Sequence, residues 1–181
     1  ANPVTSAITG DNAVCANDAG DIYSVTNTAG STYAWTVPAG ASITAGQGTN
    51  SITVTWGSTS GNVSVVETSA AGCIGAAVNL AVTVSANPVT SAITGDNAVC
   101  ANDAGDIYSV TNTAGSTYAW TVPAGASITA GQGTNSITVT WGSTSGNVSV
   151  VETSAAGCVG AAVNLAVTVS ANPVTSAITG D

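Results

Sequence analysis

The sequence contains no lysine, arginine, histidine, methionine or phenylalanine, and its nine acidic residues set the formal charge at −9. Binding to nucleic-acid phosphates and to anionic membrane surfaces depends on cationic side chains. We therefore expect no nucleic-acid partner and no membrane insertion of this segment. The absence of histidine and lysine also excludes histidine acid–base catalysis and the cradling of phosphate by a lysine.

Long apolar runs are missing as well. No stretch approaches the ~18 apolar residues that a membrane-spanning helix needs, and no basic segment followed by an apolar one marks a secretion signal. The abundance of Gly, Ser, Thr and Ala does not indicate disorder, because Val, Ile and Thr are frequent and the apolar positions alternate. The sequence therefore predicts a folded β protein.

An internal repeat organises the chain. Residues 1–85 recur as residues 86–170 with a single difference, Ile74 against Val159, and residues 171–181 repeat residues 1–11. Each unit has the size of one small domain. We expect two complete domains at 1–85 and 86–170, followed by the first strand of a third at 171–181. The repeat also predicts that this sequence is a piece of a longer array.

Strand patterns fill each repeat. In residues 51–56, Ile52, Val54 and Trp56 share one face while serine and threonine share the other. Residues 78–85 alternate in the same way, and weaker patterns lie at 6–9, 13–16, 23–25, 33–37, 41–45 and 63–65. Strands spaced by roughly 8–12 residues, each with one apolar face, need a second sheet to cover that face. The pattern predicts an all-β chain of two antiparallel β-sandwiches of about seven strands each. Because the junction at 85–89 is short and contains proline, we expect the sandwiches to lie end to end as a stiff rod.

One continuous string resembles a known family. Residues 33–56 read YAWTVPAGASITAGQGTNSITVTW, and their most specific part is the Gly-Gln-Gly-Thr-Asn-Ser-Ile segment at 46–52. Around that string, Cys15 precedes the Tyr-Ser-Val segment at 23–25, and Gly72-Cys73 follows residues 63–68. This frame resembles the PKD-like domains of Bacteroidota surface proteins over most of each repeat. The resemblance implies an immunoglobulin-like sandwich in secreted, multi-domain adhesins, including giant gliding-motility adhesins, and it implies no catalytic residues.

Four cysteines are candidates for disulfides: Cys15, Cys73, Cys100 and Cys158. The repeat favours one bridge inside each domain, Cys15–Cys73 and Cys100–Cys158, in an oxidising compartment. A rival pairing, Cys73–Cys100, staples neighbouring repeats and leaves the other two cysteines for the next units. Free thiols are the remaining alternative. Two cysteines per repeat without histidine cannot build a four-ligand zinc site, so we expect no metal there.

Aromatic and acidic residues each allow two interpretations. The tryptophans are in phase with apolar neighbours, which favours core packing over a sugar-stacking platform, although Trp56 at a strand end is a candidate for partial exposure. These core aromatics are Trp35, Trp56, Trp120 and Trp141.

Acidic loops are turns in the simpler interpretation, but oxygen-rich loops also bind calcium. The calcium candidates are Asp11, Asp18, Asp21, Asp96, Asp103 and Asp106; no other cofactor is expected.

Enzymatic chemistry is not expected. Serine nucleophiles have no base here, and a glycosidase pair formed by Asp18 and Asp21, or by Glu67 with either, needs a cleft that short loops do not provide. Asn62-Val63-Ser64 and its copy at 147–149 match the N-glycosylation pattern, which we interpret as a chance match.

Three functional hypotheses follow. The first is a non-enzymatic structural and adhesive segment of a long extracellular repeat protein, a stiff stalk or filament on the bacterial cell surface. The second is a carbohydrate- or calcium-binding module, with surface glycans or other cells as partners. The third is a filament subunit that uses lateral contacts between copies or strand exchange through residues 171–181.

Overall fold

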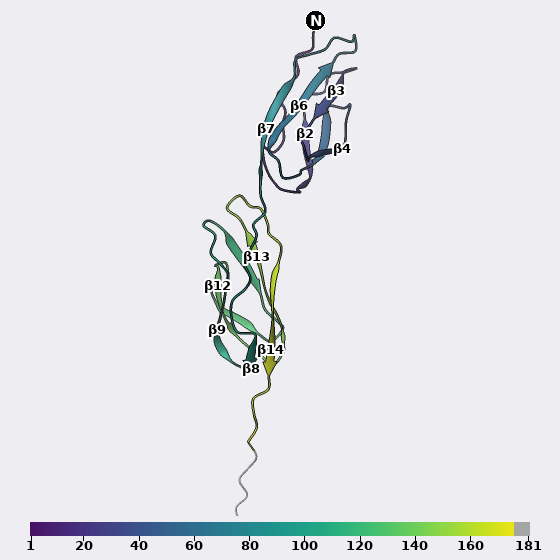
Figure 1. Ribbon diagram of the computed structural model, residues 1–181. Helices are drawn as coiled ribbons and strands as arrows, with labels where there is room; N and C mark the ends of the chain where they lie inside the picture. Colours follow the sequence, from purple (N-terminus) through teal and green to yellow (C-terminus); the bar gives the residue numbers. More distant parts are fainter. Residues whose placement is uncertain (176–181) are drawn as a thin grey trace, which may run out of the picture. The chain divides into compact units, whose positions relative to one another are not determined.

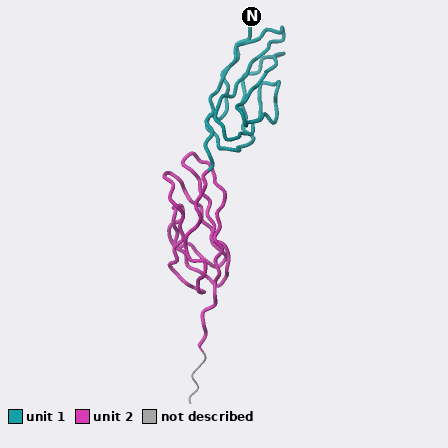
Figure 2. The backbone as a smooth tube through the Cα atoms, viewed as in Figure 1, with its two compact units in different colours: residues 1–87 teal, residues 88–181 magenta. Residues whose placement is uncertain are grey.

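A computed structural model describes residues 1–175, and Figure 1 shows the chain as strands without helices in that range. The chain divides into two compact units, residues 1–87 and residues 88–181 (Figure 2). The expected first strand of a third repeat falls largely outside the described residues, because only 171–175 are described; these five are exposed and form no strand. Within the described part of the chain, no helix is long and apolar enough to cross a membrane.

Among the described residues, each unit contains seven strands in two sheets. In the first unit the strands are β1 (Ala13–Cys15), β2 (Ala19–Ser24), β3 (Thr32–Thr36), β4 (Ser42–Ala45), β5 (Ser51–Thr55), β6 (Gly61–Thr68) and β7 (Val78–Ser85). In the second unit they are β8 (Ala98–Cys100), β9 (Ala104–Ser109), β10 (Thr117–Thr121), β11 (Ser127–Ala130), β12 (Ser136–Thr140), β13 (Gly146–Thr153) and β14 (Val163–Ser170). The predicted pair of seven-stranded β-sandwiches is confirmed.

The sheet order is the same in both units. One sheet runs β1-β7-β6-β3 and the other β2-β5-β4, with β8-β14-β13-β10 and β9-β12-β11 as their copies. The expected antiparallel pairing has one exception in each unit: β1 pairs with β7 in parallel, Val14 opposite Val84, and β8 pairs with β14 in the same way. Alternation indicates a strand and its buried face but not the direction in which it pairs, and β1 has only three residues. The weak pattern at 6–9 yields only a single bridge, Thr9 to Ser24.

The core of each sandwich is built from the alternating residues. Ile52 and Val54 of β5 are no more than 1% exposed, because the period of two turns every second side chain toward the facing sheet. All four tryptophans are 2% exposed, so the partial exposure considered for Trp56 does not occur. The Trp56 ring packs edge-to-face on Tyr23 with ring centroids 6.0 Å apart, a favoured aromatic geometry.

Candidate functional site

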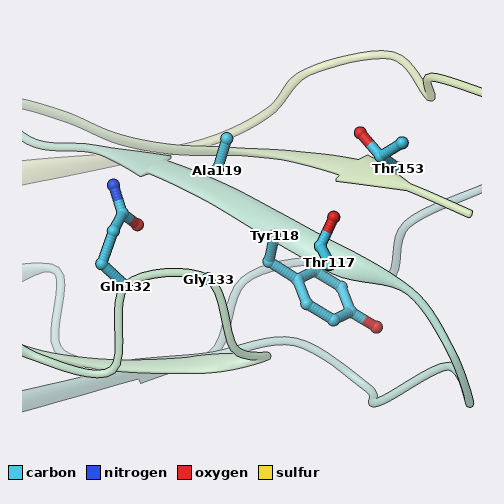
Figure 3. A pocket seen from close by; sticks show the side chains of 6 residues that line it. All are labelled: Thr117, Tyr118, Ala119, Gln132, Gly133 and Thr153. Atoms are coloured by element: carbon cyan, nitrogen blue, oxygen red, sulfur yellow. The ribbon is translucent and has the colours of Figure 1, made fainter. Parts of the chain in front are cut away.

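The family-specific segment at 46–52 holds the two sheets of a unit together. The Gln47 side chain reaches the edge strand β3: its Nε2 donates to the Trp35 carbonyl oxygen at 2.9 Å, and its Oε1 accepts from the Trp35 N–H at 3.0 Å. A side-chain amide thus satisfies backbone groups that an edge strand otherwise leaves open for pairing with another chain. Gln132 makes the same two hydrogen bonds to Trp120. Figure 3 shows Gln132 extending from its loop toward β10.

The neighbours of Gln47 in the segment also have structural roles. The Trp35 indole Nε1–H donates to the Thr49 carbonyl oxygen at 2.8 Å, and Asn50 Nδ2 donates to the Val25 carbonyl oxygen at 3.0 Å. Gly46 has φ of 84°, and a Cβ there would lie 2.0 Å from the Ser51 carbonyl oxygen. Only glycine fits that close approach. The side chains that define the motif are therefore engaged within the fold rather than presented to a ligand.

A shallow depression lies over this clamp in each unit. In the second unit it measures about 290 Å³ and is lined by Thr117, Tyr118, Ala119, Gln132, Gly133 and Thr153. Figure 3 shows the Tyr118 side chain on the opposite side of β10 from Ala119. The Tyr118 residue is 2% exposed, and its hydroxyl accepts from the Thr113 N–H at 2.7 Å. The ring of Tyr118, the one aromatic residue among those that line the depression, is therefore turned into the core.

Glu67 is a buried carboxylate in a chain without cationic side chains. It is 1% exposed, and its Oε2 accepts from the Thr5 hydroxyl at 3.0 Å. Burial raises the pKa of Glu67, but polar interactions with Ser31, Thr28 and Thr5 outweigh burial and leave the pKa below its usual value. Its Oε1 has no partner in hydrogen-bonding geometry among the described residues. Glu152 has the same burial, and its Oε2 accepts from Thr90 at 2.9 Å.

Glu67 links the first residues of a unit to its core. Thr5 lies 62 positions away in the sequence, and the backbone of Pro3 packs against Gly75, where a Cβ would lie 2.8 Å from the Pro3 oxygen. The sequence suggested for Glu67 only a place in a glycosidase pair with Asp18 or Asp21, whereas in the structure its side chain is buried and bonded to Thr5. The signal was present, because Glu67 is in phase with Val63 and Val65 on the core-facing side of β6.

The acidic loops that were calcium candidates are turns. Asp18 Oδ1 accepts from the Ala19 N–H at 3.0 Å, and Asn17 takes a left-handed φ of 64°. Burial raises the pKa of Asp21, and the nearby charges of Asp18 and Asp11 raise it further.

Within residues 1–175, no three acidic or cysteine side chains lie close enough to hold a metal ion together. The calcium candidates Asp11, Asp18 and Asp21, and their copies Asp96, Asp103 and Asp106, are therefore not gathered into such a cluster.

Tyr23 ties the acidic loop to the core. Its hydroxyl donates to the Asp11 carbonyl oxygen at 2.8 Å. Burial, with the charge of Asp21 next in importance, raises the pKa of Tyr23 to about 12. The hydroxyl therefore stays protonated and remains a hydrogen-bond donor at any physiological pH.

The cysteines differ from the predicted pairing. Cys73 and Cys100 are free thiols, whereas Cys15 and Cys158 are disulfide-bonded, so neither Cys15–Cys73 nor Cys100–Cys158 is present, and Cys73–Cys100 is absent too.

Strand register explains why an intradomain bridge is absent. Cys15 pairs with Ser85 at the end of β7, whereas Cys73 lies in the turn that follows β6. Because β6 and β7 are antiparallel, these are opposite ends of the unit, and the eight residues of β6 alone span about 23 Å. A disulfide requires Cα atoms within about 7 Å.

Comparison with known proteins now identifies the repeat. The sequence model of the PKD-like domain matches residues 1–82 and again residues 86–167. The chain belongs to the PKD-like domain family. Its two PKD-like domains stand in tandem, and the clamp formed by Gln47 or Gln132 is a structural element of each. Together with the disulfide-bonded cysteines, the family indicates an extracellular protein.

Several solved structures are similar to this chain at low identity. A fragment of intimin in complex with the intimin-binding domain of its receptor Tir is 14% identical, with a TM-score of 0.47, over 92% of this chain and 64% of that one. Fibronectin(III)-like modules of Clostridium thermocellum CbhA are 11% identical, with a TM-score of 0.43, over 96% of this chain and 100% of those modules. Murine CEACAM1b is 11% identical, with a TM-score of 0.40, over 90% of this chain and 99% of its own.

The chain thus spans less than two thirds of the intimin fragment. These likenesses concern the fold alone. No match was found among curated protein sequences.

Proposed function

We propose that this chain is a non-enzymatic structural segment of a long extracellular repeat protein, a stalk or filament of tandem PKD-like domains on a bacterial cell surface. The resemblance to Bacteroidota surface adhesins supports that origin. Its proposed partners are neighbouring repeats and lateral copies of itself. We further propose that the segment contributes to adhesion to glycans or other cells.

The parallel pairing of β1 with β7 carries this proposal. β1 is the first strand of its unit and β7 the last, and three residue pairs join them. The ladder is extended by hydrogen bonds from the Ala16 N–H to the Ser85 oxygen at 2.8 Å and from the Thr83 N–H to the Asn12 oxygen at 2.9 Å. When two parallel strands are pulled toward opposite ends, all the hydrogen bonds between them are loaded together in shear. β8 and β14 repeat the arrangement.

The clamp and the buried glutamate support the same role. Gln47 covers edge strand β3, and Glu67 fixes the first residues of the unit to its core through Thr5. A domain whose ends are both attached to its core transmits tension without fraying at its termini. The polar side chains of Gln47 and Glu67 thus form hydrogen bonds that hold the sandwich together.

Single-molecule force spectroscopy on the reduced chain, tethered at its two ends, tests the proposal. We expect two unfolding peaks of equal force, each releasing a domain that extends to roughly 300 Å at ~3.5 Å per residue. Val14→Pro removes a donor from the β1–β7 ladder and should lower one peak only, and Val99→Pro is its matched control in the second repeat. Extension without peaks, or peaks insensitive to Val14→Pro, would contradict a mechanical role for the terminal strands.

A further inference from the structure

The cysteines of the two repeats are in different chemical states. Cys100 is the repeat equivalent of Cys15, and Cys73 is that of Cys158. In each of these equivalent pairs one member is disulfide-bonded and the other is a free thiol. The sequence around equivalent cysteines is the same apart from Ile74 and Val159. Each free thiol therefore occupies a position that is oxidised in the other repeat.

The two free thiols lie at different places in their respective units, one at a strand end and the other in a turn. Cys100 ends β8 and pairs with Ser170, the last residue of β14, and it is exposed. Cys73 lies in the turn after β6, where its N–H donates to Ser69 Oγ at 3.1 Å, and it is partly exposed. Since the length of β6 and of β13 separates the two cysteine positions within a unit, neither free thiol has a partner in reach inside its own unit.

We propose that Cys100 of one copy forms a disulfide with Cys73 of a second copy of this chain, joining copies head to tail. The proposal rests on the structural role proposed above, for which it supplies a covalent partner. Cys100 and Cys73 lie on different surfaces, so the contact is heterologous. A heterologous contact leaves one cysteine of each kind open at the ends of the assembly, and it can continue into a linear polymer.

The chemistry requires a two-electron oxidant, which a low-molecular-weight disulfide supplies in an oxidising compartment. The Cys100 thiolate attacks oxidised glutathione, forms a mixed disulfide and releases one glutathione thiolate. The Cys73 thiolate of the second copy then attacks the Cys100 sulfur, forms the protein disulfide and releases the second glutathione. The protein loses two electrons and two thiol protons, and two molecules of reduced glutathione carry them.

Two single variants of the full chain test this pairing. Cys73→Ser retains only the free Cys100 thiol, and Cys100→Ser retains only the free Cys73 thiol. Each variant is treated with oxidised glutathione alone and in an equal mixture, and the products are separated by non-reducing electrophoresis. Circular dichroism checks that both variants are folded. Peptide mass spectrometry checks that Cys15 and Cys158 stay oxidised.

We expect the folded mixture to form heterodimer roughly tenfold more than either variant alone forms homodimer, a preference of ~1.4 kcal/mol. In concentrated urea, where the folded surfaces are lost, the heterodimer should fall to its statistical share. Unmodified chain should form a ladder of multimers linked by Cys100–Cys73 peptides. Homodimers as abundant as the heterodimer, or no heterodimer, would overturn the proposal. Because the force measurement uses reduced chain, this result does not depend on the mechanical test.

Discussion

The two repeats have the same fold and the same core, yet their cysteines differ. Tyr23 and Tyr108 are both fully buried, and the single substituted position is exposed in both repeats, Ile74 by 62% and Val159 by 57%. By contrast, Cys158 is 1% exposed and bonded, whereas its equivalent Cys73 is partly exposed and free. Local sequence therefore determines the sandwich, whereas equivalent cysteines in nearly identical local sequence are in different chemical states.

The largest expected effect comes from the core. Trp35→Ala should destabilise the first repeat by about 3–5 kcal/mol through lost burial and a cavity, and Trp120→Ala should do the same to the second. Denaturant unfolding of the reduced chain, followed by circular dichroism, should then separate into two transitions of equal amplitude. Unequal shifts for the two variants would show that the repeats are not energetically equivalent.

The glutamine clamp should have the next largest effect. Gln47→Ala removes two hydrogen bonds to the Trp35 backbone and leaves its N–H and carbonyl on edge strand β3 unpaired, at a cost of about 1–3 kcal/mol to the free energy of unfolding. Gln132→Ala is the matched change. The same unfolding experiment measures both, with light scattering to detect pairing of the opened edge between molecules. A shift below the experimental error would mean that the clamp has no energetic role.

Glu67→Gln should cost about 1–2 kcal/mol at pH 7, because the amide cannot replace a carboxylate that hydroxyl groups stabilise. The pKa of Glu67 is lowered in the folded state, so its contribution is present above the unfolded pKa of about 4.3 and is lost as pH falls through the folded pKa. Unfolding measured across acidic pH should therefore show a shallower loss of stability in the variant. A parallel profile would contradict an ionised buried glutamate.

Asp21→Asn should have the smallest effect on the free energy of unfolding, and it should stabilise the protein, whereas the other substitutions destabilise it. The pKa of Asp21 is raised in the folded state by burial and by Asp18 and Asp11, so the ionised form opposes folding at neutral pH. The variant should be slightly more stable than the parent at pH 7, and the difference should vanish below the unfolded pKa of about 3.9. Asp106→Asn is the matched variant, and lower stability at pH 7 in either would refute the assignment.

The sequence predicted what depends on local periodicity. Strands β3, β5, β6 and β7 follow from alternation, and the burial of the tryptophans follows from their phase. The direction and register of strand pairing are long-range properties, and the features that were not predicted depend on them. The parallel β1 and the wide separation of Cys15 from Cys73 follow from how β6 and β7 pair. Likewise, the Gly-Gln-Gly segment does not by itself indicate that the Gln47 side chain forms hydrogen bonds with the backbone of Trp35, 12 residues earlier.

Disulfide mapping of the monomeric chain tests the central claim, that the two cysteines of a repeat lie at opposite ends of its sandwich. Free thiols are alkylated in denaturant, and chymotrypsin cleaves after tyrosine, tryptophan and leucine, since trypsin has no site here. The difference between Ile74 and Val159 distinguishes the peptides that carry Cys73 and Cys158. We expect alkylated Cys73 and Cys100 and no linkage within a repeat. A Cys15–Cys73 or Cys100–Cys158 peptide would contradict the account.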